Sequence, residues 1–136
     1  MIVLVDTDVL LDLALDRAPH ATSAGALIDL LQRRPGTALV AWHTISNFYY
    51  LVAPKRGRAD TRAFLSDLTR FAEVAPTTTE SLALACRLEM KDFEDAMLVA
   101  AAMAGGADVI ATRNVRDHVN SPVRAASPAS LLTGLG

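Results

Sequence analysis

The chain alternates short apolar segments of strand type with longer segments of helical period along its whole length. Strand patterns occupy residues 1–5, 37–42, 73–76, 107–112 and 122–126. Helical patterns occupy residues 8–15, 20–34, 43–53, 59–71, 79–90, 92–105 and 127–135. The first segment, "MIVLV", is apolar at every position, as expected of a strand that is buried on both faces. Such alternation is typical of an α/β fold, so we predict a mostly parallel sheet of four to five strands flanked by helices.

Proline and glycine set the expected ends of several helices. The helical pattern over 43–53 stops before Pro54, and Gly105 closes the pattern over 92–105. Ser127 precedes Pro128 at the start of the final helix, which is the order expected of a cap followed by a first-turn proline.

Composition limits the class of protein. With 136 residues, of which 51% are hydrophobic, the chain has the size and the core of one domain, residues 1–136. The net charge of −2 gives no overall attraction to nucleic acid, so a polyanion would need a local basic patch. The single cysteine, Cys86, excludes an internal disulfide and a cysteine-based zinc site. Its apolar helical surroundings predict a packed core thiol.

The chain shows no targeting or membrane pattern. No basic segment precedes the first apolar run, and no apolar run approaches the roughly 20 residues that span a bilayer. We therefore expect neither a signal peptide nor a membrane anchor, and we expect a reducing, cytoplasmic location.

Acidic and amide side chains occupy the expected carboxyl ends of two strands and the start of a later helix. They are Asp6, Asp92, Asp95, Asn114 and Asp117. Asp92 and Asp95 lie three residues apart, so they share a helix face. Open parallel sheets bind ligands at the carboxyl ends of their strands. If the first strand neighbours the strand over 107–112, these side chains form one acidic cluster.

Clustered carboxylates repel one another, and burial increases the repulsion. A divalent cation between them would offset it, and ligands that are all oxygen favour Mg²⁺ or Mn²⁺ over zinc. The three histidines, His20, His43 and His118, have no zinc spacing. The cluster therefore indicates metal-assisted phosphoryl chemistry, in which the ion polarises the phosphate and activates water.

Some of these acids also have a simpler interpretation. Asp92 or Glu94 could be an N-terminal helix cap and dipole partner, and for Asp92 this fits as well as a metal ligand. Asp8 and Asp12 lie near a helix start, where a cap or a surface position is the simpler interpretation. Asp95 precedes a run of apolar residues, where an unpaired carboxylate is costly, so its place favours a site.

The stretch "APKRGRADTR", residues 53–62, is the one basic cluster of the chain. Its members are Lys55, Arg56, Arg58 and Arg62. They fit a solvated turn, and equally a patch that binds phosphates, because lysine and arginine side chains neutralise phosphate charge.

Several motifs in this order resemble the PIN-domain family, and within it the small prokaryotic VapC-type toxins. They are "VLVDTDVLLDL", "TISNFYYLV", "DFEDAMLVAAAMAGGADVIATRN", "VRDH" and "ASPASLL". The resemblance covers essentially the whole chain. It implies a three-layer Rossmann-like fold and an Mg²⁺- or Mn²⁺-dependent ribonuclease, the toxin of a toxin–antitoxin pair. RNA would be the substrate and an antitoxin protein a partner. Relatives commonly form homodimers, for which Phe48, Tyr49 and Tyr50 are interface candidates, although core packing accounts better for at least two of them.

The resemblance also assigns roles to individual residues. The catalytic set is Asp6, Asn47, Asp95, Asn114 and Asp117. Its three aspartates would hold the ion, with Asp92 as a further candidate, and its two asparagines would be neutral ligands or would position water. Thr7 and Thr112 would donate hydrogen bonds behind the ligands.

Asn47 departs from the family, which usually has a glutamate or aspartate at this place. An amide is a weaker metal ligand, and Asp92 or Asp8 could supply the missing charge. The alternative is a PIN-fold RNA-binding or regulatory domain with weak or no catalysis. A haloacid-dehalogenase-like phosphatase also matches the motif "VLVDTDVLL", but the later Gly-Asp motif of those enzymes is missing.

Overall fold

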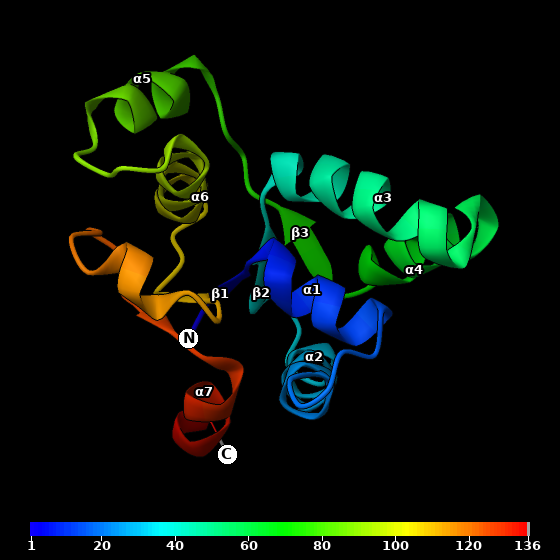
Figure 1. The fold of residues 1–136 in the computed structure, drawn as a ribbon. Coiled ribbons are helices and arrows are strands. Elements are labelled where there is room, and N and C mark those ends of the chain that lie inside the picture. Colours follow the sequence, from blue (N-terminus) through cyan, green and yellow to red (C-terminus); the bar gives the residue numbers. More distant parts are fainter. Residues whose placement is uncertain (136) are drawn as a thin grey trace.

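The computed structural model describes residues 1–135 and contains a five-stranded sheet in which all neighbouring strands are parallel (Figure 1). The strands are β1 (Val3–Val5), β2 (Ala38–Val40), β3 (Ala72–Val74), β4 (Val109–Ala111) and β5 (Ala125–Ala126). Their order across the sheet is β3-β2-β1-β4-β5, so β1 lies at the centre between β2 and β4. The predicted parallel sheet of four to five strands is confirmed.

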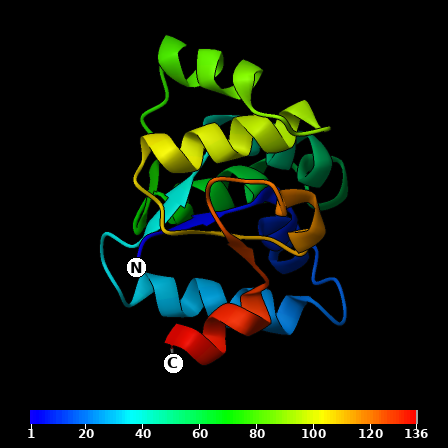
Figure 2. The ribbon, with the colours of Figure 1, turned by 90° about the vertical axis from the view of Figure 1, so that its left-hand side faces the viewer.

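Helices cover both faces of this sheet. They are α1 (Thr7–Ala14), α2 (Ala21–Gln32), α3 (Trp42–Arg56), α4 (Arg58–Leu68), α5 (Thr79–Arg87), α6 (Phe93–Ala104), the 3-10 helix η1 (Val115–His118) and α7 (Pro128–Leu135). Figure 2 shows α5 and α6 above one face and α2 and α7 below the other. Between residues 1 and 135, no helix has both the length and the apolar character that crossing a bilayer requires.

Successive side chains of a strand point to opposite sides of the sheet. Because helices cover both sides, the central strands are buried on both faces. Val3 and Val5 pack into the apolar cluster that includes residues of α1, α2, α3, α4 and α7. Leu4, which lies between them, packs into the cluster formed with α6. β2 and β4 divide their side chains in the same way. The result is the expected three-layer arrangement of helices, sheet and helices.

The neighbouring places of β1 and β4 bring the ends of these two strands together. The strands are in register from Val3↔Val109 to Val5↔Ala111. The backbone N–H of Asp6 continues the ladder by donating to the carbonyl oxygen of Ala111 at 3.0 Å. The residues after the two strands therefore lie side by side at the carboxyl edge of the sheet, as the sequence predicted if the strands were neighbours.

Helix α3 continues beyond the end predicted at Pro54. It runs to Arg56 and ends at Gly57, whose φ of 90° is unfavourable for residues with a side chain. Pro54 lies in the last turn, where it removes one helical hydrogen bond and is followed by only Lys55 and Arg56 before the helix ends. The predicted helix end at residue 53 was therefore too early in the chain.

Cys86 is exposed, so the prediction of a packed core thiol was wrong. Helix α5 packs against α6 through Ala85, which clusters with Ala96 and Ala100. Ala85 is the one fully buried residue of this helix. Cys86 lies one residue further round the helix, a rotation of about 100°, and therefore faces solvent.

A buried carboxylate joins α1 to the loop that follows β4. Asp12 is 1% exposed, so the expectation of a cap or surface position for it was wrong. Its Oδ1 accepts from Nε of Arg17 at 2.9 Å, and its Oδ2 accepts from Nε of Arg113 at 2.6 Å. A second nitrogen of Arg113 donates to Oδ1 at 3.1 Å, which makes the pairing bidentate. Two arginines thus neutralise one buried acid and fix the loop against α1.

We predict that Asp12→Ala lowers the free energy of unfolding by about 3 kcal/mol, because it removes the shared partner of two arginines in a buried ion-pair network. The matched control is Asp29→Ala. Asp29 pairs with Arg33 on the surface at 3.5 Å, with both side chains at least 65% exposed. The control should change stability by less than about 0.5 kcal/mol. Urea unfolding measures both values, and equal effects would contradict this account of the network.

Candidate functional site

A cleft opens at the carboxyl edge of the sheet, between α3, the starts of α1 and α6, and the loop after β4. Its volume is about 540 Å³, which lies within the range of ligand-binding clefts. The six carboxylates that line it are Asp6, Asp8, Asp92, Glu94, Asp95 and Asp117. The other lining residues are Thr7, Leu11, Asn47, Tyr50, Leu51 and Asn114. We refer to this hollow as the acidic cleft.

The fold brings together the residues that the sequence singled out as catalytic or metal-binding. Asp6, Asn47, Asp92, Asp95, Asn114 and Asp117 all line the acidic cleft. Thr7 lines it too, and Thr112 is fully buried and hydrogen-bonded to two of its acids. Their positions are thus established, while their chemical roles stay predictions.

Asp6 is the most perturbed acid of the cleft. It caps the start of α1 by accepting from the backbone N–H of Thr7 at 2.7 Å, and its second oxygen accepts from the hydroxyl of Thr112 at 2.9 Å. Burial, followed by the charge of Asp8, raises the pKa of Asp6 to about 7, although the hydrogen bonds oppose the rise. The charge of Asp95 adds a smaller contribution in the same direction.

Asp8 shares its hydrogen-bond donor with Asp6. The hydroxyl of Thr112 lies 3.2 Å from Oδ2 of Asp8, so a single hydroxyl proton faces two carboxylates. The backbone N–H of Arg113 also donates to this oxygen at 3.0 Å. The other oxygen, Oδ1, is buried without a hydrogen-bond partner among the described residues. Burial raises the pKa of Asp8, and the hydrogen bonds oppose the rise.

The start of α6 supplies three acids with different surroundings. Asp92 caps the helix by accepting from the backbone N–H groups of Glu94 at 2.8 Å and Asp95 at 3.2 Å, so the cap interpretation of Asp92 is confirmed. Asp95 lies deeper. Burial raises its pKa, which the neighbouring His118 lowers and the charges of Asp92, Asp117 and Glu94 raise further.

Glu94 is a member of the cleft that sequence reasoning missed. Its Oε1 accepts from the side-chain amide of Asn47 at 3.1 Å, which links α6 to α3 across the cleft. The sequence offered Glu94 as an N-terminal cap and dipole partner of the helix, and no site role was assigned to it. The contact with Asn47 depends on packing between two helices that are far apart in the chain.

His118 is the second residue that the sequence missed, because the histidines were compared only with zinc-ligand spacings. Its side chain is fully buried, and its Nε2 lies 3.9 Å from Oδ1 of Asp95. In the described part of the chain, neither ring nitrogen has a hydrogen-bond partner. The imidazole therefore lies behind the carboxylate of Asp95.

The donor set of the cleft suits a hard cation. Its ligand atoms are carboxylate and amide oxygens, which Mg²⁺ and Mn²⁺ prefer. The unpartnered oxygen of Asp8 and the raised pKa of Asp6 both mark a place where positive charge would be stabilising. In residues 1–135, no three acidic, histidine or cysteine side chains already form a metal-binding group. An ion would therefore have to draw the carboxylates closer together.

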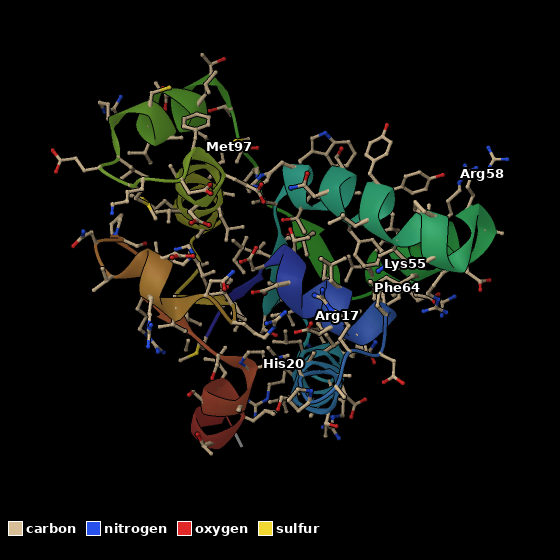
Figure 3. The ribbon with its side chains drawn as sticks, in the orientation of Figure 1. Arg17, His20, Lys55, Arg58, Phe64 and Met97 are labelled. Atoms are coloured by element: carbon tan, nitrogen blue, oxygen red, sulfur yellow. The ribbon has the colours of Figure 1, made fainter. Side chains whose placement is uncertain are left out.

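The basic turn, residues 53–62, lies apart from the acidic cleft. Lys55 and Arg56 line a separate hollow with Arg17, next to the C-terminal end of α1, and Arg56 donates to the carbonyl oxygen of Ala14 at 2.9 Å. Asp6 caps the opposite end of α1, about 12 Å away along the helix. Figure 3 shows Lys55 and Arg58 toward the far ends of α3 and α4, on the side away from α6. The structure does not bring these cations onto the acids.

The family model described as PIN domain matches residues 2–116 of the chain. No curated protein sequence matches the chain significantly.

Solved structures share its fold. VapBC2 from Rickettsia felis, bound to a DNA fragment from its promoter, has a TM-score of 0.70 at 15% identity, over 93% of this chain and 98% of that chain. VapC20 from Mycobacterium tuberculosis, a sarcin–ricin loop cleaving toxin, has a TM-score of 0.63 at 17% identity, over 79% of this chain and 86% of that chain. FitAcB from Neisseria gonorrhoeae has a TM-score of 0.63 at 15% identity, over 94% of this chain and 99% of that chain. At these identities the likeness establishes the fold alone.

We predict that Asp6→Asn stabilises the metal-free protein. A folded-state pKa of about 7 against an unfolded value of 3.8 means that folding takes up a proton between these pH values. The contribution of Asp6 to stability therefore falls as pH rises from about 4 to about 7. The variant should gain about 2–4 kcal/mol at about pH 8, little at about pH 4, and have a flatter pH profile between them.

Thermal unfolding in EDTA across this pH range measures the gain. Asp67→Asn is the matched control, because Asp67 is 68% exposed and pairs with Arg70 on the surface. An Asp6 variant no more stable than its parent under alkaline conditions would show that the acids do not strain the fold.

Proposed function

Because the chain belongs to the PIN-domain family, we propose that it is a ribonuclease that hydrolyses RNA phosphodiester bonds with the help of Mg²⁺ or Mn²⁺. The observation that carries this proposal is the convergence of Asp6, Asp95 and Asp117 on the acidic cleft. These residues come from the end of β1, the first turn of α6 and the helix η1. Three distant parts of the chain thus deliver carboxylates to one place.

In this proposal Asp6, Asp95 and Asp117 hold the ion. When bound, Mg²⁺ or Mn²⁺ would supply the charge that polarises a phosphate and favours deprotonation of the attacking water. The burial and crowding of Asp6 support the assignment, because a cation beside Asp6 and Asp8 would offset both the burial and the repulsion that raise the pKa of Asp6.

The remaining polar residues hold these acids in place. The N–H of Thr7 and the hydroxyl of Thr112 each donate to a different oxygen of Asp6, so its carboxylate is fixed in orientation. The backbone N–H of Asn114 in turn donates to the hydroxyl oxygen of Thr112 at 3.1 Å. The side chain of Asn114, on the wall of the cleft, would position a water molecule or a phosphate oxygen.

We assign to Glu94 the charge that the family usually has on the helix carrying Asn47. Asn47 holds Glu94 at 3.1 Å, so the carboxylate occupies space next to the amide. The two acids considered from sequence are less suited. Asp92 caps α6 with its Oδ1, and Oδ2 of Asp8 accepts from Arg113 and Thr112, but among the described residues neither acid has a hydrogen bond to Asn47, as Glu94 has.

A toxin–antitoxin role forms part of the same proposal. Its support is the shared fold with VapBC2 and with the toxin VapC20, together with an apolar hollow between α3, α5 and α6. Trp42 is 68% exposed and Leu82 is 56% exposed at this hollow, which fits a protein partner such as an antitoxin. A homodimer, a cytoplasmic location and guidance of RNA by the basic turn are further parts of the proposal.

The second candidate function is an RNA-binding or regulatory PIN domain without catalysis. Asn47 favours it, because an amide replaces a charged ligand and is itself engaged by Glu94. The family match removes the support for a haloacid-dehalogenase-like phosphatase.

A pool of single-stranded RNA of randomised sequence, with cut sites read by sequencing, separates the two candidates. We expect cleavage with Mn²⁺ and none in EDTA. Asp95→Asn should slow cleavage at least about 100-fold, since even residues behind metal ligands are worth 10–100-fold. It should also weaken Mn²⁺ binding in calorimetric titration, whereas Asp67→Asn should change neither. Intact RNA in the presence of Mn²⁺, with RNA binding retained, would favour the second candidate.

Asn47→Asp tests the role of Glu94. The substitution places a second carboxylate about 3 Å from the first, so it should lower the thermal stability of the protein in EDTA. With Mn²⁺ the extra charge should tighten binding by about tenfold, the size of change expected for a metal's immediate surroundings. Glu94→Gln is the reciprocal variant and should weaken Mn²⁺ binding. Unchanged Mn²⁺ affinity in both variants would remove this pair from the site.

A further inference from the structure

His118 is a polar side chain to which the fold gives no hydrogen-bond partner. It ends the helix η1, directly after Asp117, and its side chain is 0% exposed. Among the described residues, neither Nδ1 nor Nε2 takes part in a hydrogen bond. Buried polar groups are nearly always paired, because an unpaired donor or acceptor has lost its contact with water and gained nothing in return. An apolar ring of similar size would avoid this cost, so packing alone does not explain the imidazole.

The imidazole faces one of the proposed metal ligands. Its Nε2 lies 3.9 Å from Oδ1 of Asp95 in the first turn of α6. Hydrogen bonds of the N–H···O type extend to about 3.2 Å, so the gap has to close by roughly 0.7 Å for one to form. Rotation of the Asp95 carboxylate about its last side-chain torsion can close it, because that torsion has a broad minimum.

Asp95 lacks the donors that hold Asp6. The two carboxylate oxygens of Asp6 accept from the N–H of Thr7 and from the hydroxyl of Thr112. Within residues 1–135, the side chain of Asp95 accepts no hydrogen bond, and its contact with His118 is its one ion pair. The acid without a donor and the imidazole without a partner therefore face each other.

His118 is set too far back to bind an ion in the acidic cleft itself. Asp95 and Asp117 line both the cleft and the hollow that adjoins it at Lys91 and Arg116, whereas in the described chain His118 lines neither. The side chain of Asp95 is 21% exposed, against 0% for His118. The carboxylate thus separates the imidazole from the solvent of the cleft. Any effect of His118 on an ion has to pass through Asp95.

We propose that His118 is a positioning residue for Asp95. Its Nε2–H donates to Oδ1 of Asp95 when an ion is bound, and the other carboxylate oxygen is thereby held toward the cleft. This inference rests on the proposed function, in which Asp95 holds Mg²⁺ or Mn²⁺, and it adds the residue that fixes this ligand from behind.

The physical basis is the preorganisation of a ligand. A carboxylate that turns freely has to give up that freedom when it binds an ion, whereas a donor behind one oxygen sets its orientation. Hydrogen bonds behind metal ligands are typically worth about 10- to 100-fold in metal affinity. A neutral imidazole donates from only one of its nitrogens, so this role requires the proton on Nε2.

The affinity test compares His118→Phe, which keeps a ring without a donor, with His118→Gln, whose amide can donate from about the place of Nε2. In calorimetric titration, His118→Phe should bind Mn²⁺ about 10- to 100-fold more weakly than the parent. His118→Gln should bind it more tightly than His118→Phe does. The matched control is His20→Phe, because His20 is exposed at the start of α2, and it should keep the parent's affinity.

Thermal unfolding of the same variants in EDTA separates positioning from packing. His118→Phe should not lower the Tm of the metal-free protein, because it removes buried polar atoms that had no partner. A residue that only fills the core would show the opposite pattern, with a lower Tm and an unchanged affinity for Mn²⁺.

The protonated nitrogen of His118 is a readout that packing does not set. Nitrogen-15 NMR of the unsubstituted, metal-free protein in mildly alkaline buffer, which favours the neutral imidazole, should place the proton on Nε2. Mg²⁺, which is diamagnetic, should then move the Hε2 resonance downfield as the hydrogen bond to Asp95 forms.

Three results would overturn the inference. The first is a His118→Phe variant that binds Mn²⁺ as tightly as the parent. The second is a proton on Nδ1 in place of Nε2, which needs no substitution and so decides even where a variant fails to fold. The third is an equal loss of Mn²⁺ affinity in both His118 variants together with a lower Tm in EDTA. In each case the parent can still bind Mn²⁺ and cleave RNA, so the proposed function would stand. A parent that binds no Mn²⁺ would remove both.

Discussion

The parallel pairing of β1 with β4 is the constraint on which the rest of the site depends. It places Asp6, which follows β1, beside Thr112, which follows β4. One hydroxyl then serves the carboxylates of Asp6 and Asp8, and burial makes their proximity costly. The ion pair of Asp12 with Arg113 holds the loop after β4 against α1 and so keeps these residues together. The core thus holds together acids that would separate in a looser structure.

The sequence was sufficient for the layers of the fold and for the positions of most site residues. Alternating strand and helix patterns predicted the parallel sheet. Asp6, directly after β1, and Asp117, in η1 after β4, reached one cleft because parallel strands end at one edge. Contacts between individual side chains could not be predicted from the sequence. Asn47 meets Glu94, and Asp12 meets Arg113, only after helices and loops that are distant in the chain have packed. The rotation of α5 that exposes Cys86 likewise depends on its contact with α6.

The positions of the charged side chains matter more for this site than the net charge of the chain. Six carboxylates gather at one edge of the sheet, and their mutual repulsion makes a cation the natural complement. Lys91 and Arg116 adjoin these acids directly, whereas Lys55 and Arg56 lie at the far end of α1. Positive charge therefore lies directly beside the acidic cleft as well as at the far end of α1. This division explains how a chain with net negative charge can present a surface for a polyanion.

The central claim is that a divalent ion binds between the end of β1 and the start of α6. Anomalous diffraction at the manganese edge, from crystals grown with Mn²⁺, tests it most directly. The account predicts an anomalous peak within about 2.5 Å of carboxylate oxygens of both Asp6 and Asp95, the distance of direct coordination. A cleft without a peak in crystals saturated with Mn²⁺, or an ion bound elsewhere while these two carboxylates stay free, would contradict it.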